Sequence, residues 1–115
     1  MALNKVKGDY GEKLAQDYLL TKGYKILETN FRYSHKEIDI VAQDGEYIVF
    51  VEVKYRKNLE YGTPLEAINT KKMMQIRKVA EYYVYINEYR GCVRFDCIGI
   101  LDQGNIDIKH IVNAF

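Results

Sequence analysis

The chain has no tryptophan, one proline and only two cysteines among its 115 residues. Cys92 and Cys97 lie five positions apart in one predicted strand, so their side chains point to opposite faces and should not pair. The N-terminal residues also lack the apolar core of a signal peptide. Without a disulfide framework or a leader, the sequence predicts a reduced, cytoplasmic protein.

Long apolar runs, linkers and an excess of charge are missing as well. No stretch approaches the roughly 20 apolar residues of a membrane-spanning helix, and no Pro- or Gly-rich segment marks a boundary, so we expect one domain over residues 1–115. The formal net charge is +1, from 17 Lys and Arg against 16 Asp and Glu. A nucleic-acid binder of this composition must gather its positive charge on one surface.

The most informative stretch covers residues 37–54 and reads EIDIVAQDGEYIVFVEVK. Two alternating, β-branched runs flank an Asp-Gly pair, which is a strong signal for a β-hairpin. With the turn centred on Asp44-Gly45, Glu37 lies opposite Glu52 and Asp39 lies one diagonal step from Glu52. Diagonal neighbours across a hairpin are about 7–8 Å apart, a gap that a divalent cation with oxygen ligands can close.

Strand side chains alternate between two faces, which sorts this hairpin into a charged and an apolar side. The charged face is expected to carry Glu37, Asp39, Glu52 and Lys54. The apolar face, expected to point toward the core, carries Ile38, Ile40, Val51 and Val53. Three carboxylates and a lysine on one face predict a metal site.

The rest of the chain predicts helices on either side of this hairpin. The expected elements are a helix over 4–22, a strand over 24–31, a short helix over 64–68, a helix over about 71–88, and strands over 93–101 and 106–112. Gly8 and Gly11 in the first helix indicate either close approach of another backbone or a later helix start. Thr63 and Thr70 are the expected N-caps of the two later helices. The α-β-β-β-α-β-β order predicts an α/β fold with a mixed central sheet of about five strands flanked by helices.

The charged face has the chemistry for phosphodiester hydrolysis, which needs a Lewis acid, an activated water and positive charge at the transition state. Asp39 and Glu52 are the expected Mg²⁺ ligands, with the Val53 carbonyl as a third and Mn²⁺ as a substitute ion. Lys54 would hold or help to deprotonate the attacking water. Glu37 and Glu12 would orient metal-bound waters or hold a second ion.

These residues carry a resemblance. Asp39, Glu52-Val53-Lys54 on the adjoining strand and Glu12 on the first helix resemble the PD-(D/E)XK nuclease superfamily, which includes restriction endonucleases and archaeal Holliday-junction resolvases. Over nearly its whole length the chain resembles the YraN-like family of small bacterial proteins. The matching positions are Gly8, Gly11-Glu12, Ala15, Gly23, Asn30, Arg32, Glu37-Ile38-Asp39, residues 50–54, Arg56, Lys72 and Arg94-Phe95-Asp96.

The resemblance implies a restriction-endonuclease-like fold and a metal-dependent endonuclease acting on DNA, by analogy with the resolvases on branched or structured DNA. A resolvase cuts two strands symmetrically, so the analogy also allows a homodimer. The chain departs from the family pattern at Lys36, where relatives usually have glycine, and at Phe31, where many have tryptophan. Neither position is an expected ligand.

Basic residues supply candidates for contacts with nucleic-acid phosphates. The main candidates are Arg32, Arg56, Lys57 and Lys72. Arg56, Lys57 and Lys72 could form a basic rim together with Lys54, Lys71, Arg77 and Lys78. Surface helices are often this basic, and Arg32 is also a plain ion-pair partner for Glu37. Asp96, in the middle of a predicted strand, is expected to pair with Arg94 or a lysine rather than to take part in catalysis.

Two other interpretations stay open at this point. The charged face of the hairpin can be an ordinary solvated sheet face with cross-strand ion pairs that contribute little. Alternatively, the chain can be a non-catalytic nucleic-acid-binding or accessory protein that keeps the nuclease fold. DNA binding that survives chelation, without cleavage under any metal, would favour the accessory protein.

Overall fold

The computed structural model describes residues 2–60 and 62–115, with side chains from Asp9 onward. Its elements, in chain order, are α1 (Ala2–Thr21), β1 (Lys25–Tyr33), β2 (Lys36–Asp44), β3 (Tyr47–Arg56), the 3₁₀ helix η1 (Leu65–Ala67), α2 (Thr70–Ile86), β4 (Cys92–Asp102) and β5 (Ile106–Ile111). The predicted α/β class and the order of its main elements are confirmed.

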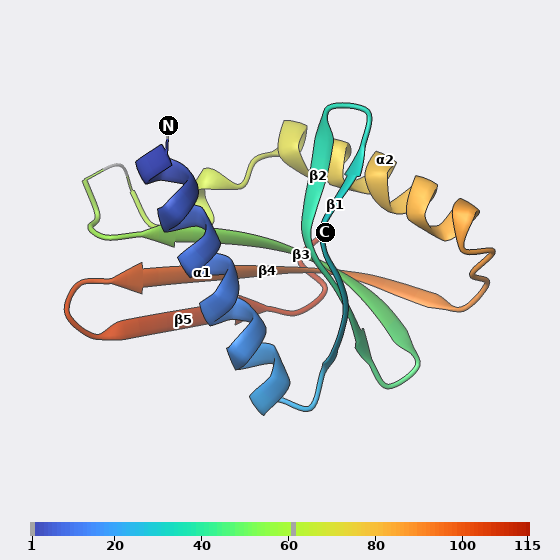
Figure 1. Ribbon diagram of the computed structural model, residues 1–115, viewed down its shortest axis with the longest axis horizontal. Coiled ribbons are helices and arrows are strands. Elements are labelled where there is room, and N and C mark those ends of the chain that lie inside the picture. Colours follow the sequence, from blue (N-terminus) through green and yellow to red (C-terminus); the bar gives the residue numbers. More distant parts are fainter. Residues whose placement is uncertain (1, 61) are drawn as a thin grey trace.

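The five strands form one sheet in the order β1-β2-β3-β4-β5 (Figure 1). Neighbouring strands run antiparallel except for β3 and β4, which are parallel. A parallel pair needs a crossover connection, and α2 supplies it between these two strands. The predicted mixed sheet flanked by helices is therefore confirmed.

The hairpin of β2 and β3 has a different register from the predicted one. Asp44 faces Tyr47 and Ile40 faces Val51, so the two-residue turn is Gly45-Glu46 rather than Asp44-Gly45. Gly45 takes a φ of +59°, a left-handed conformation that glycine adopts without steric cost. A shift of two residues does not by itself move a side chain to the other face, but it places Asp39 rather than Glu37 opposite Glu52.

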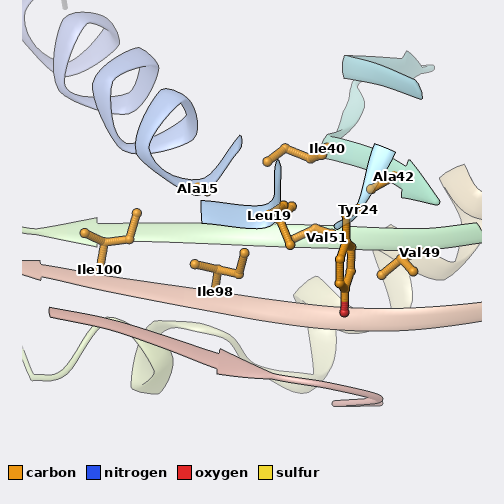
Figure 2. Close-up of a cluster of buried hydrophobic side chains, with 9 residues drawn as sticks. All are labelled: Ala15, Leu19, Tyr24, Ile40, Ala42, Val49, Val51, Ile98 and Ile100. Atoms are coloured by element: carbon orange, nitrogen blue, oxygen red, sulfur yellow. The ribbon is translucent and has the colours of Figure 1, made fainter. Parts of the chain in front are cut away.

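Two hydrophobic clusters cover the two faces of the sheet. The first places Ala15 and Leu19 of α1 over strand residues that include Val51 and Ile98, as Figure 2 shows. The second joins α2 to Phe50 and Phe95. Because Phe50 and Val51 are consecutive residues of β3, α1 and α2 lie on opposite faces.

The predicted apolar face of the hairpin is wrong at one position. Ile40 and Val51 belong to the first cluster, and Val53 packs against it, but Ile38 belongs to the second cluster beneath α2. Two residues that are two positions apart in a regular strand share a face, so the alternation of β2 breaks at Asp39. The side chains of β2 therefore change face at Asp39, which was predicted to bind metal.

Helix α1 approaches β3 closely at Gly11. A Cβ atom added to Gly11 would lie 2.7 Å from the Cβ atom of Tyr55. Of the two explanations for the early glycines, close approach is therefore confirmed at Gly11, and α1 does not start late. Gly8 lies among the residues whose side-chain surroundings the structure does not describe. The contact at Gly11 sets the position of the next residue, Glu12.

Helix α2 begins one residue before its predicted start, because Asn69 rather than Thr70 is its N-cap. The Asn69 side chain accepts a hydrogen bond from the Lys72 amide at 2.9 Å. Thr63 does not cap η1, whose N-cap is Pro64, although the Glu66 carboxylate accepts a hydrogen bond from the Thr63 amide. In the part of the chain that the structure describes, no helix is both long and apolar enough to cross a membrane.

Candidate metal centre

Asp39 lies where β2 and β3 stop pairing. The last paired residues of this ladder are Ile40 and Val51, and one further step of the same register places Asp39 opposite Glu52. The Val53 amide, no longer bonded across the ladder, donates to Oδ2 of Asp39 at 2.8 Å. The separation of the two strands therefore opens a place for the Asp39 carboxylate, and the backbone of β3 holds it there.

Three carboxylates meet at this point. Glu12, Glu37 and Asp39 each offer an oxygen atom within 4.8 Å of the other two, and all three side chains are partly buried. Glu12 comes from α1, which Gly11 brings against β3, whereas the other two come from β2. Carboxylate oxygens at this spacing are the ligands that Mg²⁺ and Mn²⁺ take in proteins. All three residues were among those predicted from the sequence.

Asn30 of β1 ties two of these carboxylates together. Its Nδ2 atom donates to Oε1 of Glu12 at 2.8 Å and to Oε1 of Glu37 at 2.5 Å. Its φ of +53° is left-handed, a conformation in which asparagine is several-fold enriched among non-glycine residues. Asn30 was not among the predicted site residues, and its match to the family pattern near the end of a predicted strand was the only signal for it.

Glu52 of β3 is the most buried acid of the site, with only 2 % of its surface exposed. Its carboxyl group lies close enough to that of Asp39 to raise the pKa of Asp39. Its charge is matched from the far side by Lys72 of α2, whose Nζ atom lies 3.4 Å from Oε2. A buried carboxylate with a single long ion pair still has oxygen lone pairs to offer a cation.

Burial and mutual repulsion disfavour the fully ionised state of these carboxyl groups. Burial, with the charges of Asp39 and Glu37, raises the pKa of Glu12 from its ordinary 4.5 to about 7 against the opposing hydrogen bond from Asn30. Burial first, and then the hydrogen bond and charge of Glu52, raise the pKa of Asp39 above its usual range. A bound divalent cation would relieve both effects.

Lys54 and Val53 lie in β3 beside these acids. Lys54 is partly buried, and strand alternation puts its side chain on the same side as that of Glu52. The Val53 side chain packs against the first hydrophobic cluster, and its amide makes the hydrogen bond to Asp39. The Glu-Val-Lys segment therefore supplies a buried acid, a backbone contact and a base within three consecutive residues.

The four basic residues predicted to contact nucleic acid have different surroundings in the structure. Lys72 pairs with Glu52, and Arg32 pairs with Glu37 at 3.2 Å although it is 76 % exposed. Arg56 ends β3 and is partly buried, and Lys57 follows it as an exposed residue. Two of the four thus neutralise the acidic site.

A second charged cluster is buried under α1 and serves the fold. Asp96 is fully buried and accepts two hydrogen bonds from Arg94, at 2.9 and 3.0 Å. His110 Nε2 lies 2.7 Å from Asp96 Oδ2, and the Asn113 amide donates to Oδ1 at 3.0 Å. The predicted pairing of Asp96 with Arg94 is confirmed.

Comparison with known proteins places the chain among bacterial relatives. A sequence profile described as "Uncharacterised protein family UPF0102" matches residues 11–100. A UPF0102 protein of Thermodesulfovibrio yellowstonii is 51 % identical, with 94 % of each chain covered. One from Clostridioides difficile is 48 % identical over 97 % of this chain and 98 % of its own, and one from Caldicellulosiruptor bescii is 45 % identical over 90 % and 89 %. These names state no activity.

Proposed function

Given that the chain belongs to the uncharacterised protein family UPF0102, we propose from its site that it is a divalent-metal-dependent nuclease that hydrolyses phosphodiester bonds of DNA. Membership of UPF0102 confirms that the chain belongs to a family of bacterial proteins, as predicted. Membership of the PD-(D/E)XK nuclease superfamily, and with it the restriction-endonuclease-like fold, is part of the proposal.

One observation carries the proposal. The two acids of the predicted motif, Asp39 and Glu52, meet across the gap where β2 leaves β3, and the Val53 amide between Glu52 and Lys54 holds Asp39. Charged residues on a solvated sheet face would stay apart and exposed. Glu52 is instead buried, and burial of a carboxylate costs free energy unless a cation or hydrogen bonds compensate its charge.

The donor set suits a hard cation. Asp39 and Glu52 would hold Mg²⁺ or Mn²⁺ through carboxylate oxygens. Glu12 and Glu37, which each have an oxygen atom within 4.8 Å of an oxygen of Asp39, would orient the waters of the bound ion. A cation bound there supplies a Lewis acid for the phosphate and lowers the pKa of bound water. The raised pKa values of Glu12 and Asp39 fit such a site, because they reflect charge that the protein alone leaves uncompensated.

The chain's own residues have separate tasks in this mechanism. Lys54 orients the attacking water and stabilises the negative charge that builds up on the phosphate. Asn30 keeps the Glu12 and Glu37 carboxylates facing the site. Lys72 balances the charge of Glu52 until substrate and metal arrive. Branched or structured DNA is the proposed substrate by analogy with the resolvases, and twofold cleavage of it would require a homodimer.

The test is a cleavage assay on linear duplex, single-stranded and four-way-junction DNA, each with Mg²⁺, with Mn²⁺ and with EDTA. The expected result is metal-dependent cutting of at least one substrate by the wild type, and its loss in Glu52→Gln and Lys54→Gln. Asp17→Asn is the matched control, because Asp17 is an exposed residue of α1 that pairs only with Lys13 among the described residues. Cleavage that persists in Glu52→Gln would refute the assignment.

A non-catalytic nucleic-acid-binding role is the second candidate, and the ion pairs of the site favour it. Lys72 and Arg32 already neutralise Glu52 and Glu37 without any metal. A protein of this kind would bind DNA equally well in EDTA and Mg²⁺ and would cut none of the three substrates. The same assay therefore separates the two functions.

A further inference from the structure

A basic pocket lies beside the acidic site, between the start of β2 and the first turns of α2. Its volume is about 400 Å³, within the range of ligand-binding clefts. Its lining residues are Lys36, Thr70, Lys71, Met74, Gln75 and Lys78. In Figure 1 the end of the β1–β2 hairpin passes next to α2 at this level.

The helical repeat separates this pocket from the acidic site. Lys71, Met74 or Gln75, and Lys78 follow the spacing of three and four residues that lines up side chains on one helix face. Lys72, one position along the helix, points instead to Glu52. The first nine residues of α2 thus present one lysine to the acids and two to the pocket.

The pocket is positively charged, and none of its lining residues is acidic. Among the residues that the structure describes, Lys36, Lys71 and Lys78 make none of the ion pairs, whereas Lys72 and Arg32 do. One end of the pocket, at Thr70 and Lys71, belongs to the first turn of α2, where the helix dipole favours an anion. Three uncompensated lysines around one hollow point to an anionic ligand with several charges.

The dimensions match a nucleic-acid strand. Lys36 precedes Glu37 and lies three residues, or roughly 10 Å of strand, from Asp39. Lys71 and Lys78 are about 10 Å apart along the helix axis. Both lengths exceed the spacing of neighbouring phosphates along a strand, so the three lysines can reach different phosphates of a strand that passes the acidic site.

We propose that the Lys36–Lys71–Lys78 pocket binds backbone phosphates of the nucleic acid whose scissile bond lies at Asp39 and Glu52. The proposal rests on the proposed function for the choice of nucleic acid over other polyanions. It assigns the main phosphate contacts to the hairpin end and α2, rather than to Arg56 and Lys57 at the end of β3. Contacts to phosphates do not depend on the identity of the bases, so binding in this pocket is not specific for a nucleotide sequence.

The experiment compares Lys36→Ala/Lys71→Ala/Lys78→Ala with a control that removes the same charge elsewhere, Lys22→Ala/Lys25→Ala/Lys109→Ala. Lys22 and Lys25 follow the C-terminal end of α1, and Lys109 lies on β5. Binding of a fluorescent 20-base-pair duplex is followed by anisotropy over a salt series in EDTA, so that neither metal nor cleavage enters. Equal thermal unfolding of the variants shows that all of them fold.

The pocket variant should bind at least tenfold more weakly than the control at low salt. Its plot of log affinity against log salt should be less steep by about 2.7, or about 0.9 for each phosphate that the variant no longer neutralises. Equal weakening in both variants would overturn the proposal, as would a pocket variant that keeps wild-type DNA affinity but no longer binds vesicles of anionic lipid. Absence of cleavage with selective loss of DNA binding would instead refute the nuclease and leave the pocket standing.

Discussion

The backbone amide of Val53 donates a hydrogen bond of 2.8 Å to the carboxylate of Asp39. This bond joins two strands beyond the last pair of their ladder. It also links the two parts of the proposed motif, because Val53 lies between Glu52 and Lys54. Since the donor is a main-chain group, side-chain substitutions in β3 can change the chemistry of the site while Asp39 stays in place.

Replacing Lys54 should slow cleavage without weakening metal binding. Lys54→Gln removes the positive charge on the same side of β3 as Glu52 but none of the carboxylates. We expect cleavage to slow by about 10²–10⁴-fold, the usual contribution of a positioned acid or base, with unchanged affinity for Mn²⁺. Single-turnover cleavage and a metal titration measure the two quantities. A variant with wild-type cleavage rate would remove Lys54 from the mechanism.

Stability in EDTA should fall as the pH rises from about 4.5 to about 7. The raised pKa of Glu12, about 7 against an ordinary 4.5, means that the folded protein holds a proton that the unfolded chain releases in this interval. Asp39, whose pKa is also raised, acts in the same direction. Burial alone would raise the pKa of Asp96, but hydrogen bonds with His110 and Arg94 lower it from 3.8, so its stabilising effect is lost only at more acidic pH.

Urea unfolding across this pH range measures the effect. Glu12→Gln should flatten the fall, and Mg²⁺ should reverse it at neutral pH because the cation binds the folded, ionised site. A free energy of unfolding that rises over the same interval, for the wild type in EDTA, would contradict the protonation of the acidic cluster described above.

Replacing Gly11 with alanine should destabilise the protein, although alanine usually stabilises a helix. On intrinsic propensity alone, Gly11→Ala would stabilise α1 by about 1 kcal/mol. The new Cβ atom would lie 2.7 Å from Cβ of Tyr55, so the helix must move away from β3. We expect a loss of about 1–3 kcal/mol in the free energy of unfolding, together with weaker metal binding as Glu12 shifts. A more stable Gly11→Ala protein would show that the close approach does not exist.

The buried Asp96 cluster should dominate stability without serving catalysis. Asp96→Ala leaves the buried Arg94 guanidinium and the His110 ring without their main partner. A loss of about 3–5 kcal/mol is expected, as for a broken buried ion pair. Asp107→Ala, on the exposed side of β5, is the control and should change the unfolding free energy by less than about 0.5 kcal/mol. Similar losses in both variants would contradict the structural role.

Local patterns explain how much of the fold the sequence predicted. Alternation, helical spacing and turn residues are short-range properties, so they located every strand and both α-helices to within a few residues. The hairpin register was wrong because an Asp-Gly pair allows glycine at either turn position, and Gly45 occupies the first. The capping residue of α2 was misplaced by one because Asn69 and Thr70 are both good caps.

The sequence predicted acids that the structure brings near one another, but not the residues that contact them. Asp39 and Glu52 belong to one hairpin, so its short-range pattern placed them near each other even with the register wrong by two residues. The contacts of Asn30 with Glu12 and of Lys72 with Glu52 join segments far apart in the chain, and no local pattern encodes them. The same holds for Ile38, whose change of face follows from the point at which β2 leaves β3.

The most direct test is a calorimetric titration of Mg²⁺ and Mn²⁺ into the wild type, Asp39→Asn and the control Asp17→Asn. Asparagine keeps an oxygen that can accept the Val53 amide but lacks the charge that a cation needs. We predict saturable binding to the wild type and the control, and affinity at least tenfold weaker in Asp39→Asn. Equal binding heats in all three proteins would contradict a metal site at Asp39.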